Sequence, residues 1–106
     1  MAKELLSENP PVYFRRNLLN MAAIAKIHNI ELVFATWAYS PYFNDYASTT
    51  HYQQGFSENN NIIKQVADSQ NIPFFDFAKA MSDEIRYWSD GRHVNEEGAL
   101  LKAELF

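Results

Sequence analysis

The sequence predicts an α/β fold in which a parallel sheet is covered by helices on both faces. Two short apolar stretches typical of buried strands alternate with longer stretches of helical periodicity, in the order helix, strand, helix, strand, helix, motif loop, helix. An aromatic-rich loop follows the first strand, at the carboxyl end where such sheets bind ligands. The 106 residues allow one domain at most, spanning residues 1–106.

Composition excludes several classes of function. Nine Lys and Arg against thirteen Asp and Glu give a net charge of −4, which argues against nucleic-acid partners and anionic membrane surfaces. The chain has no cysteine, which excludes disulfides, thiolate metal sites and cysteine nucleophiles. Neither a secretory signal nor an apolar run long enough to cross a bilayer is evident. We expect a cytoplasmic location for the chain as written, leave the location of a longer parent open, and expect no cofactor.

The first helix is predicted from Pro11 onward, because prolines at 10 and 11 end any helix over the first nine residues and suit the start of the next. We expect His28 at its carboxyl end, capped by Asn29, to face the helix dipole rather than act in catalysis. The side expected to face solvent carries Arg15, Arg16, Asn20 and Lys26. The inner stripe consists of Phe14, Leu18, Met21, Ala25 and His28, widened by Leu19, Ala22 and Ile24.

Residues 31–36 form a short apolar run between helices, which predicts a buried parallel strand. The loop 37–52 that follows is rich in aromatic rings. Two interpretations stay open: a wall that faces substrate, or a large loop that packs its own rings together. In the first interpretation the candidate substrate-binding residues are Trp37, Tyr39 and Tyr42.

The second helix is predicted to open at residues 57–60 and to fade out at residues 69–71. Residues 72–77 are the second strand, in which an early Pro73 is tolerable because a first residue need not donate to the ladder. The inner face of the helix consists of Phe56, Ile62, Ile63, Val66 and Ala67.

Two further helices complete the pattern. Asp76 is the expected N-cap of a short helix over residues 77–86, a role that we prefer to a catalytic one. Asn95 caps the last helix, whose first turn carries Glu96 and Glu97 in agreement with the helix dipole. Its packing residues are Leu100, Leu101, Ala103 and Leu105. Two strands alone leave sheet edges exposed, so we expect an incomplete sheet that promotes oligomers or poor solubility.

The residues that carry chemistry lie together in residues 87–98. Asp90 and His93 are three apart, with Gly91 between them to allow a tight turn, so a carboxylate can hold one imidazole nitrogen. The other nitrogen can then take a proton from a hydroxyl and return it to a leaving group. A serine within reach would be a nucleophile for ester cleavage.

Residues 90–99 resemble the terminal block of the SGNH or GDSL-type hydrolases: an aspartate-x-x-histidine, an apolar residue, Asn95, and Gly98 on the last helix. The earlier segments are similar in order and spacing to the second half of that fold. The resemblance implies a three-layer α/β/α, flavodoxin-like fold with a parallel sheet, of which this chain is the carboxyl-terminal half. It also implies hydrolysis of acyl or acetyl esters of a small molecule, carbohydrate or lipid, with His93 as general base then acid and Asp90 as its orienter.

The front half of that triad is missing from the sequence. The chain has seven serines, and none lies in a Gly-Asp-Ser or Gly-x-Ser-x-Gly context. The stretch from Tyr42 to Asp45 resembles an oxyanion block but lacks its glycine, so we discount Asn44. We therefore expect the chain alone to be inactive.

Three alternatives stay open beside the hydrolase. His93 could be an ordinary surface histidine held by Asp90. A metal could be bound by His51, Asp90 and His93, or with His28, although no two histidines share a helix-face spacing. The chain could also be a non-catalytic binding module that uses its aromatic loop.

Overall fold

The computed structural model describes residues 11–106. The possible helix over the first nine residues and Ser7 both lie outside the described residues. No helix within these residues is both long and apolar enough to cross a bilayer. The elements follow the predicted order. They are α2 (Pro11–Ile27), β1 (Phe34–Ala35), the 3₁₀ helix η1 (Tyr46–Ser48), α3 (Thr50–Gln70), β2 (Phe74–Phe75), α4 (Phe77–Ala80), the 3₁₀ helix η2 (Ile85–Tyr87) and α5 (Glu96–Leu105).

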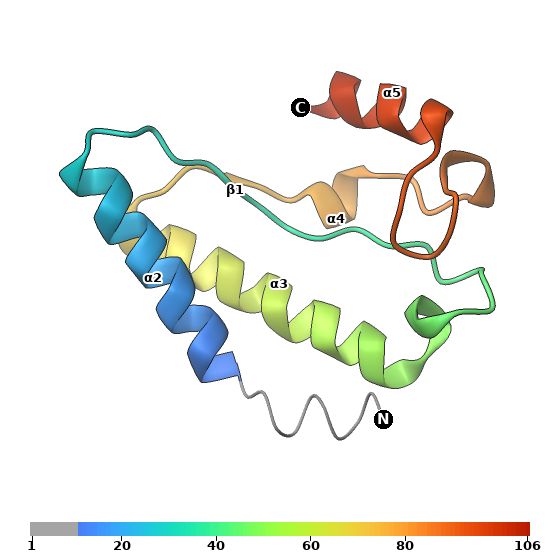
Figure 1. Ribbon diagram of the computed structural model, residues 1–106, viewed down its shortest axis with the longest axis horizontal. Helices are drawn as coiled ribbons and strands as arrows, with labels where there is room; N and C mark the ends of the chain where they lie inside the picture. The colour runs from blue at the N-terminus through green and yellow to red at the C-terminus, as the bar shows by residue number, and fades with distance from the viewer. Residues whose placement is uncertain (1–10) are drawn as a thin grey trace.

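The two strands are parallel and separate two layers of helices. Phe34 is paired with Phe74, and Ala35 with Phe75. Because side chains alternate along a strand, the first pair faces α2 and α3 while the second faces the α5 side. Figure 1 shows α2 and α3 on one side of the strands and α5 on the other. The predicted parallel sheet with helices on both faces is confirmed.

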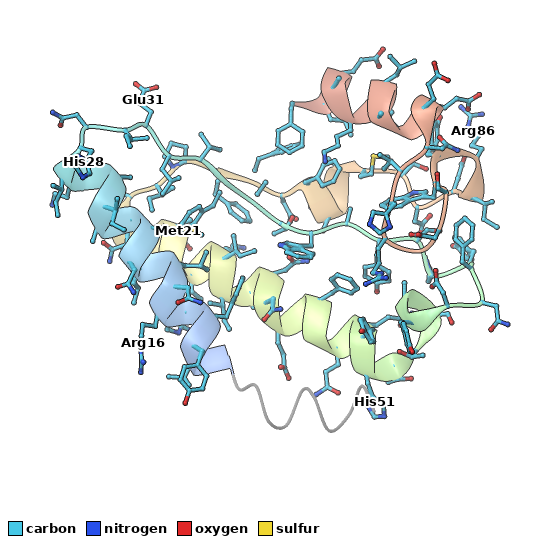
Figure 2. The ribbon with its side chains drawn as sticks, viewed as in Figure 1. Arg16, Met21, His28, Glu31, His51 and Arg86 are labelled. Carbon is cyan, nitrogen blue, oxygen red and sulfur yellow. The ribbon has the colours of Figure 1, made fainter. Side chains whose placement is uncertain are left out.

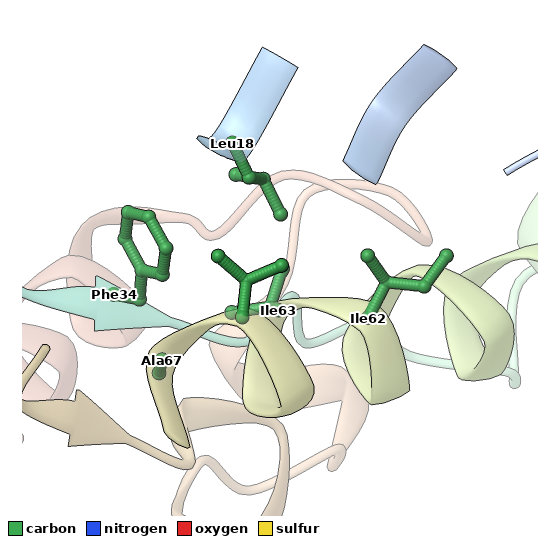
Figure 3. Packing of buried hydrophobic residues seen from close by; sticks show 6 residues of the cluster. Leu18, Phe34, Ile62, Ile63 and Ala67 are labelled. Atoms are coloured by element: carbon green, nitrogen blue, oxygen red, sulfur yellow. The ribbon is translucent and has the colours of Figure 1, made fainter. Parts of the chain in front are cut away.

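The first core cluster lies between the strands and the α2–α3 pair. Figure 3 shows Leu18 of α2, Ile63 of α3 and Phe34 of β1 pointing toward one another. Four of the five residues predicted for the inner face of α3 are buried there, and Phe56 is half-buried. The whole cluster consists of Leu18, Phe34, Ile62, Ile63, Val66 and Ala67.

The second cluster lies on the opposite face and holds the motif loop against the sheet. Phe77, Met81 and Trp88 are buried at its centre. The indole Nε1 of Trp88 donates to the carbonyl of Ser82 at 2.9 Å, so the residue before the motif is fixed by both packing and a hydrogen bond. The partly buried neighbours include Ala35, Phe75 and Val94. Of the four residues predicted to pack from the last helix, Leu101 and Leu105 contact this cluster, whereas Leu100 and Ala103 are exposed.

Helix α2 buries a narrower stripe than predicted. Leu18, Ala22 and Ala25 are buried, but the predicted inner residues Met21 and Ile24 are exposed because α3 covers only one side of the apolar arc. The prediction was also wrong in giving His28 and Leu19 inward positions. The carboxyl end matches expectation, since α2 ends at Ile27 and Asn29 adopts the left-handed conformation, with φ of 54°.

Both strands are shorter than the predicted runs 31–36 and 72–77, at two residues each. The amide of Thr36 still donates to Phe75 O at 3.2 Å, but pairing ends there. The side chain of Asn60 then hydrogen-bonds to both backbone groups of Trp37. It accepts from the N–H at 2.8 Å and donates to the carbonyl at 3.0 Å. A side chain from α3 therefore ends the ladder at the carboxyl end of β1.

Helix α3 begins well before the predicted start at residues 57–60. Thr49 is its N-cap and accepts from the backbone of Tyr52. Ring stacking favours the extra turns: Tyr46 stacks on Tyr52 with centroids 5.3 Å apart, and Tyr39 stacks on Phe56 at 4.8 Å. The predicted end is confirmed by a left-handed residue at position 71.

Of the helix predicted over residues 77–86, only the first four residues are α-helical and form α4. Asp76 caps it by accepting from the backbone of Lys79, as predicted. Met81 is already extended, and the next two carbonyls have tertiary partners: that of Ser82 accepts from Trp88, and that of Asp83 accepts from the hydroxyl of Ser40 at 2.7 Å. These contacts draw the chain out of the helix before η2.

Candidate active site

The motif loop is a tight turn closed at its base. Trp88 and Val94 form an antiparallel bridge, and the amide of Ser89 donates to the carbonyl of His93 at 2.7 Å. The closed turn therefore brings Asp90 and His93 close together.

The Asp90 carboxylate holds the His93 ring from one side. Nδ1 of His93 lies 2.9 Å from both carboxylate oxygens. The same carboxylate accepts the backbone N–H groups of Arg92 and His93, each at 2.8 Å. An ionised carboxylate has no proton to donate and can only accept hydrogen bonds. Nδ1 therefore carries the proton in this contact, and Nε2 is left as the basic nitrogen.

These hydrogen bonds also keep Asp90 charged. The pKa of its carboxyl is lowered, first by the backbone N–H of Arg92 and then by the His93 side chain. The pair is open to solvent, with exposed side-chain fractions of 68% for His93 and 45% for Asp90. The arrangement is that of a general base held in one tautomer and accessible to a reactant.

Asp45 anchors this loop to the rest of the chain, a role that the sequence did not reveal. Its carboxylate accepts from the backbone of Gly91 at 2.8 Å and from that of Ala47 at 3.0 Å. The amide of Ser40 in turn donates to the carbonyl of Gly91 at 2.9 Å. A Cβ at position 91 would lie 2.4 Å from the Cβ of Ala47, so only glycine fits against this anchor.

Asn95 and Gly98 fix the other end of the loop onto α5. The side-chain oxygen of Asn95 accepts from Gly98 at 2.9 Å, while its amide group donates to the carbonyl of Arg86 at 2.8 Å. A Cβ at position 98 would lie 1.9 Å from the carbonyl oxygen of Tyr87. The predicted cap is therefore confirmed, and the glycine is required by close approach of the backbone.

A hollow opens beside His93 at the carboxyl end of β1. Of the three candidate substrate-binding residues, Trp37 lines it together with His93. Tyr39 lines a neighbouring hollow, and Tyr42 lies outside both, with its hydroxyl 3.5 Å from the carboxylate of Asp83. The full lining of the His93 hollow is Ala35, Thr36, Trp37, Ala38, Phe77, Trp88, Arg92, His93, Val94, Lys102 and Phe106.

The aromatic loop packs largely on helix α3. The rings of Tyr39 and Phe56 stack at an interplanar angle of 12°, and Trp37 lies 6.1 Å from Phe56 in a tilted arrangement. Tyr39 is thus engaged within the fold, as in the second interpretation of the loop. Trp37 and Tyr42 keep most of their surface exposed and stay available to a ligand.

No serine of residues 11–106 reaches the base. The hydroxyls of Ser40, Ser48 and Ser69 donate to nearby backbone carbonyls, and no serine lines the hollow that contains His93. Within the same part of the chain, the His93 ring has Asp90 as its only hydrogen-bonding side chain.

The metal alternative finds no support in this part of the chain. Figure 2 shows His28 just past the carboxyl end of α2 and His51 at the amino-terminal end of α3. Across residues 11–106, no group of three His, Asp or Glu side chains comes close enough to hold a metal ion. The candidate site is therefore an acid–base pair.

The fold resembles that of a known class of proteins. No protein-family model and no curated protein matches the chain. Among solved structures, the chain is similar to a GDSL-like lipase from Bacteroides thetaiotaomicron, with a TM-score of 0.74 and 22% sequence identity. The match covers 91% of this chain and 50% of that one, so the chain spans about half the length of the solved structure. At this identity the likeness shows the fold, a GDSL-type α/β fold, as the sequence predicted.

Proposed function

We propose that this chain supplies the Asp-His part of the catalytic triad of a serine-type ester hydrolase of the SGNH/GDSL type. The observation that carries the proposal is the Asp90–His93 pair, with Nδ1 held at 2.9 Å by a carboxylate and the ring lining a hollow beside Trp37. The likeness in fold to a GDSL-like lipase supports a hydrolase parent.

Each residue has a defined role in this chemistry. Nε2 of His93 takes the proton of a serine hydroxyl as its oxygen attacks the ester carbonyl, and Asp90 stabilises the imidazolium that forms. His93 then gives this proton to the departing alcohol, which leaves an acyl-serine. Water attacks the acyl group while His93 takes its proton, and returning that proton to the serine oxygen releases the acid.

We place the nucleophile and the oxyanion donors in polypeptide outside residues 11–106. Support comes from the described serines, none of which lines the hollow or bonds the His93 ring. The match also covers only half of the similar lipase structure, and the other half of such a fold would hold these groups.

The substrate that we propose is an acyl or acetyl ester of a small molecule, carbohydrate or lipid. The hollow beside His93 combines apolar walls, among them Phe77 and Trp88, with the exposed ring of Trp37. Such walls suit the apolar part of an acyl group or the flat face of a sugar.

The test compares ester hydrolysis by two proteins: the 106-residue chain, and the longest product of the reading frame that contains it. We expect p-nitrophenyl ester turnover only in the longer product. His93→Ala should lower its kcat by a factor of about 10⁴ or more, and Asp90→Asn by about 10²–10⁴. His51→Ala is the matched control, because His51 is also an exposed histidine. Ester turnover by this variant should stay unchanged. Full activity of the His93→Ala variant would refute the proposal.

A non-catalytic binding module is the second candidate, favoured by the lack of a serine among the residues that line the hollow. In that case the aromatic loop would bind ligand and the Asp90–His93 pair would have no chemical role. Asp90→Asn would then leave ligand binding unchanged, and the longest product of the reading frame would not hydrolyse esters.

A further inference from the structure

Trp37 forms part of two neighbouring hollows. Together with Ala38, it lines both the hollow that contains His93 and a second hollow whose wall includes Lys79 and Asp83. Trp37 is 59% exposed, so it is open to a ligand rather than sealed in a core. A ligand that reaches from His93 into the second hollow would therefore contact this residue.

The backbone of Trp37 lies beyond the last hydrogen bond between β1 and β2, and Asn60 of α3 takes the place of a partner strand. The side chain of Asn60 accepts from the N–H of Trp37 at 2.8 Å and donates to its carbonyl at 3.0 Å. A side-chain amide carries both a donor and an acceptor, as a peptide group does, so it can satisfy both backbone groups at once. The two bonds together fix this point of the backbone.

The contact is specific to one position on α3. Asn60 is the middle one of three consecutive asparagines at positions 59–61. Successive residues of an α-helix point about 100° apart, so its two neighbours face other directions. Within residues 11–106, the hydrogen bonds to Trp37 come from Asn60 alone, and Asn61 is exposed.

The ring of Trp37 contacts the same side of α3. Phe56 lies one turn before Asn60, and residues four apart share one side of a helix. The centroid of the Phe56 ring is 6.1 Å from that of Trp37 and 4.8 Å from that of Tyr39, on which it stacks. Helix α3 thus holds the backbone of Trp37 through one residue and its ring through another, which places the indole before any ligand binds.

We propose that Asn60 is a positioning residue, which holds Trp37 as the shared wall of the two hollows so that an ester long enough to enter both can bind. This role rests on the ester chemistry proposed above, since Trp37 lines the hollow that contains His93. A wall that is already in place costs less conformational entropy on binding than one that the ligand must order. Loss of Asn60 would therefore weaken the binding of long esters and leave the acid–base pair unchanged.

The test measures kcat and KM for a small and a large ester with the longest product of the reading frame. Methyl acetate is small enough to stay beside His93, whereas 4-methylumbelliferyl butyrate is large enough to enter both hollows. Asn60→Ala should raise KM for the large ester about five- to tenfold, while its kcat and the KM for methyl acetate stay within about twofold of wild type. Asn60→Asp keeps an acceptor for the Trp37 N–H and should lie between the two. Asn61→Ala is the same substitution at the exposed neighbouring position and serves as the control.

A double substitution separates positioning from a general structural role. If Asn60 acts through Trp37, adding Asn60→Ala to Trp37→Ala should cause no further increase in KM for the large ester. A purely structural role would lower the amount of folded protein, and with it the apparent kcat for both esters, without this coupling. Unchanged KM in Asn60→Ala, or additive effects in the double variant, would overturn the proposal.

Amide hydrogen exchange tests the contact itself without any substrate. The amide of Trp37 should be protected in the wild-type product and should exchange at least about tenfold faster in Asn60→Ala, but not in Asn61→Ala. A lack of ester turnover by the wild-type product would refute the ester chemistry, and this role with it. Turnover together with an unprotected Trp37 amide would refute the role of Asn60 alone.

Discussion

The motif loop differs from the edge of β1 that does not pair with β2, called here the free edge. The difference is whether their backbone hydrogen-bonding groups have partners within the described residues. Around Asp90 and His93, the polar backbone is bonded within the loop, to Asp45 or to Asn95. At the free edge, backbone groups lack a described partner strand and apolar side chains such as Val33 are exposed. The acid–base geometry is thus a local property of the motif loop, whereas one edge of the sheet has no partner strand within residues 11–106.

Replacing Gly98 should have the largest effect on the loop. Gly98→Ala places a Cβ 1.9 Å from the carbonyl oxygen of Tyr87, a contact that the backbone can relieve only by moving. We expect a loss of about 3 kcal/mol in the free energy of unfolding, measured by urea denaturation. Glu97→Ala, an exposed change in the same turn, should stay close to wild type. Equal stability of the two variants would show that the loop is not closely fixed to α5.

Removing the Asp45 anchor should have the next largest effect. Asp45→Ala leaves the amides of Gly91 and Ala47 without their acceptor, which should cost about 2 kcal/mol in urea denaturation. Asp45→Asn retains a side-chain acceptor and should lie between this variant and wild type. The His93 resonances should also shift in Asp45→Ala if the anchor positions the pair. Unchanged resonances would mean that the pair needs no support from the η1 region.

On the exposed side of α2, a polar substitution should matter little in the 106-residue chain. Ile24→Gln changes an exposed side chain, so unfolding of the 106-residue chain should change by less than about 0.5 kcal/mol. If further polypeptide covers this side of α2 in the longer reading-frame product, the same change should cost about 1–2 kcal/mol there through loss of apolar burial. Lys26→Gln on the same helix is the control for both proteins. A cost that is equal in the two proteins would show that this side of α2 stays uncovered.

The smallest effect concerns the charge of Asp90. Its pKa is lowered in the folded chain, so its contribution to stability is present above the unfolded pKa and is lost as pH falls through the folded value. His93→Ala should raise this pKa only part of the way toward the ordinary one, because the N–H of Arg92 still donates. Carboxyl NMR titration of both proteins measures the shift. An unchanged pKa in His93→Ala would mean that the ring does not bond the carboxylate in solution.

The sequence predicted those parts of the fold that depend on local chemistry. The helical caps at Asp76 and Asn95, the left-handed end at Asn29 and the pairing of Asp90 with His93 all follow from residue type and short spacing. Each of these contacts joins residues at most a few positions apart. Such contacts require no knowledge of the tertiary structure.

Tertiary contacts explain what the sequence did not predict. The early start of α3 depends on Phe56 stacking with Tyr39, from a distant part of the loop. The early end of α4 depends on Trp88 reaching the Ser82 carbonyl. The Asp45 anchor joins positions 46 residues apart, and no spacing rule points to it. Ile24 is exposed because α3 covers only one side of the apolar face of α2. The helical repeat of apolar residues does not show which side another element will cover.

A covalent serine probe tests the central claim most directly. A fluorophosphonate reacts with a serine that a neighbouring histidine activates, and mass spectrometry locates the modified residue. In the longest reading-frame product, we expect one labelled serine outside residues 11–106, with labelling abolished by His93→Ala and retained in His51→Ala. Labelling of a serine within residues 11–106, or labelling that persists in His93→Ala, would contradict a triad whose base is His93 and whose nucleophile lies elsewhere.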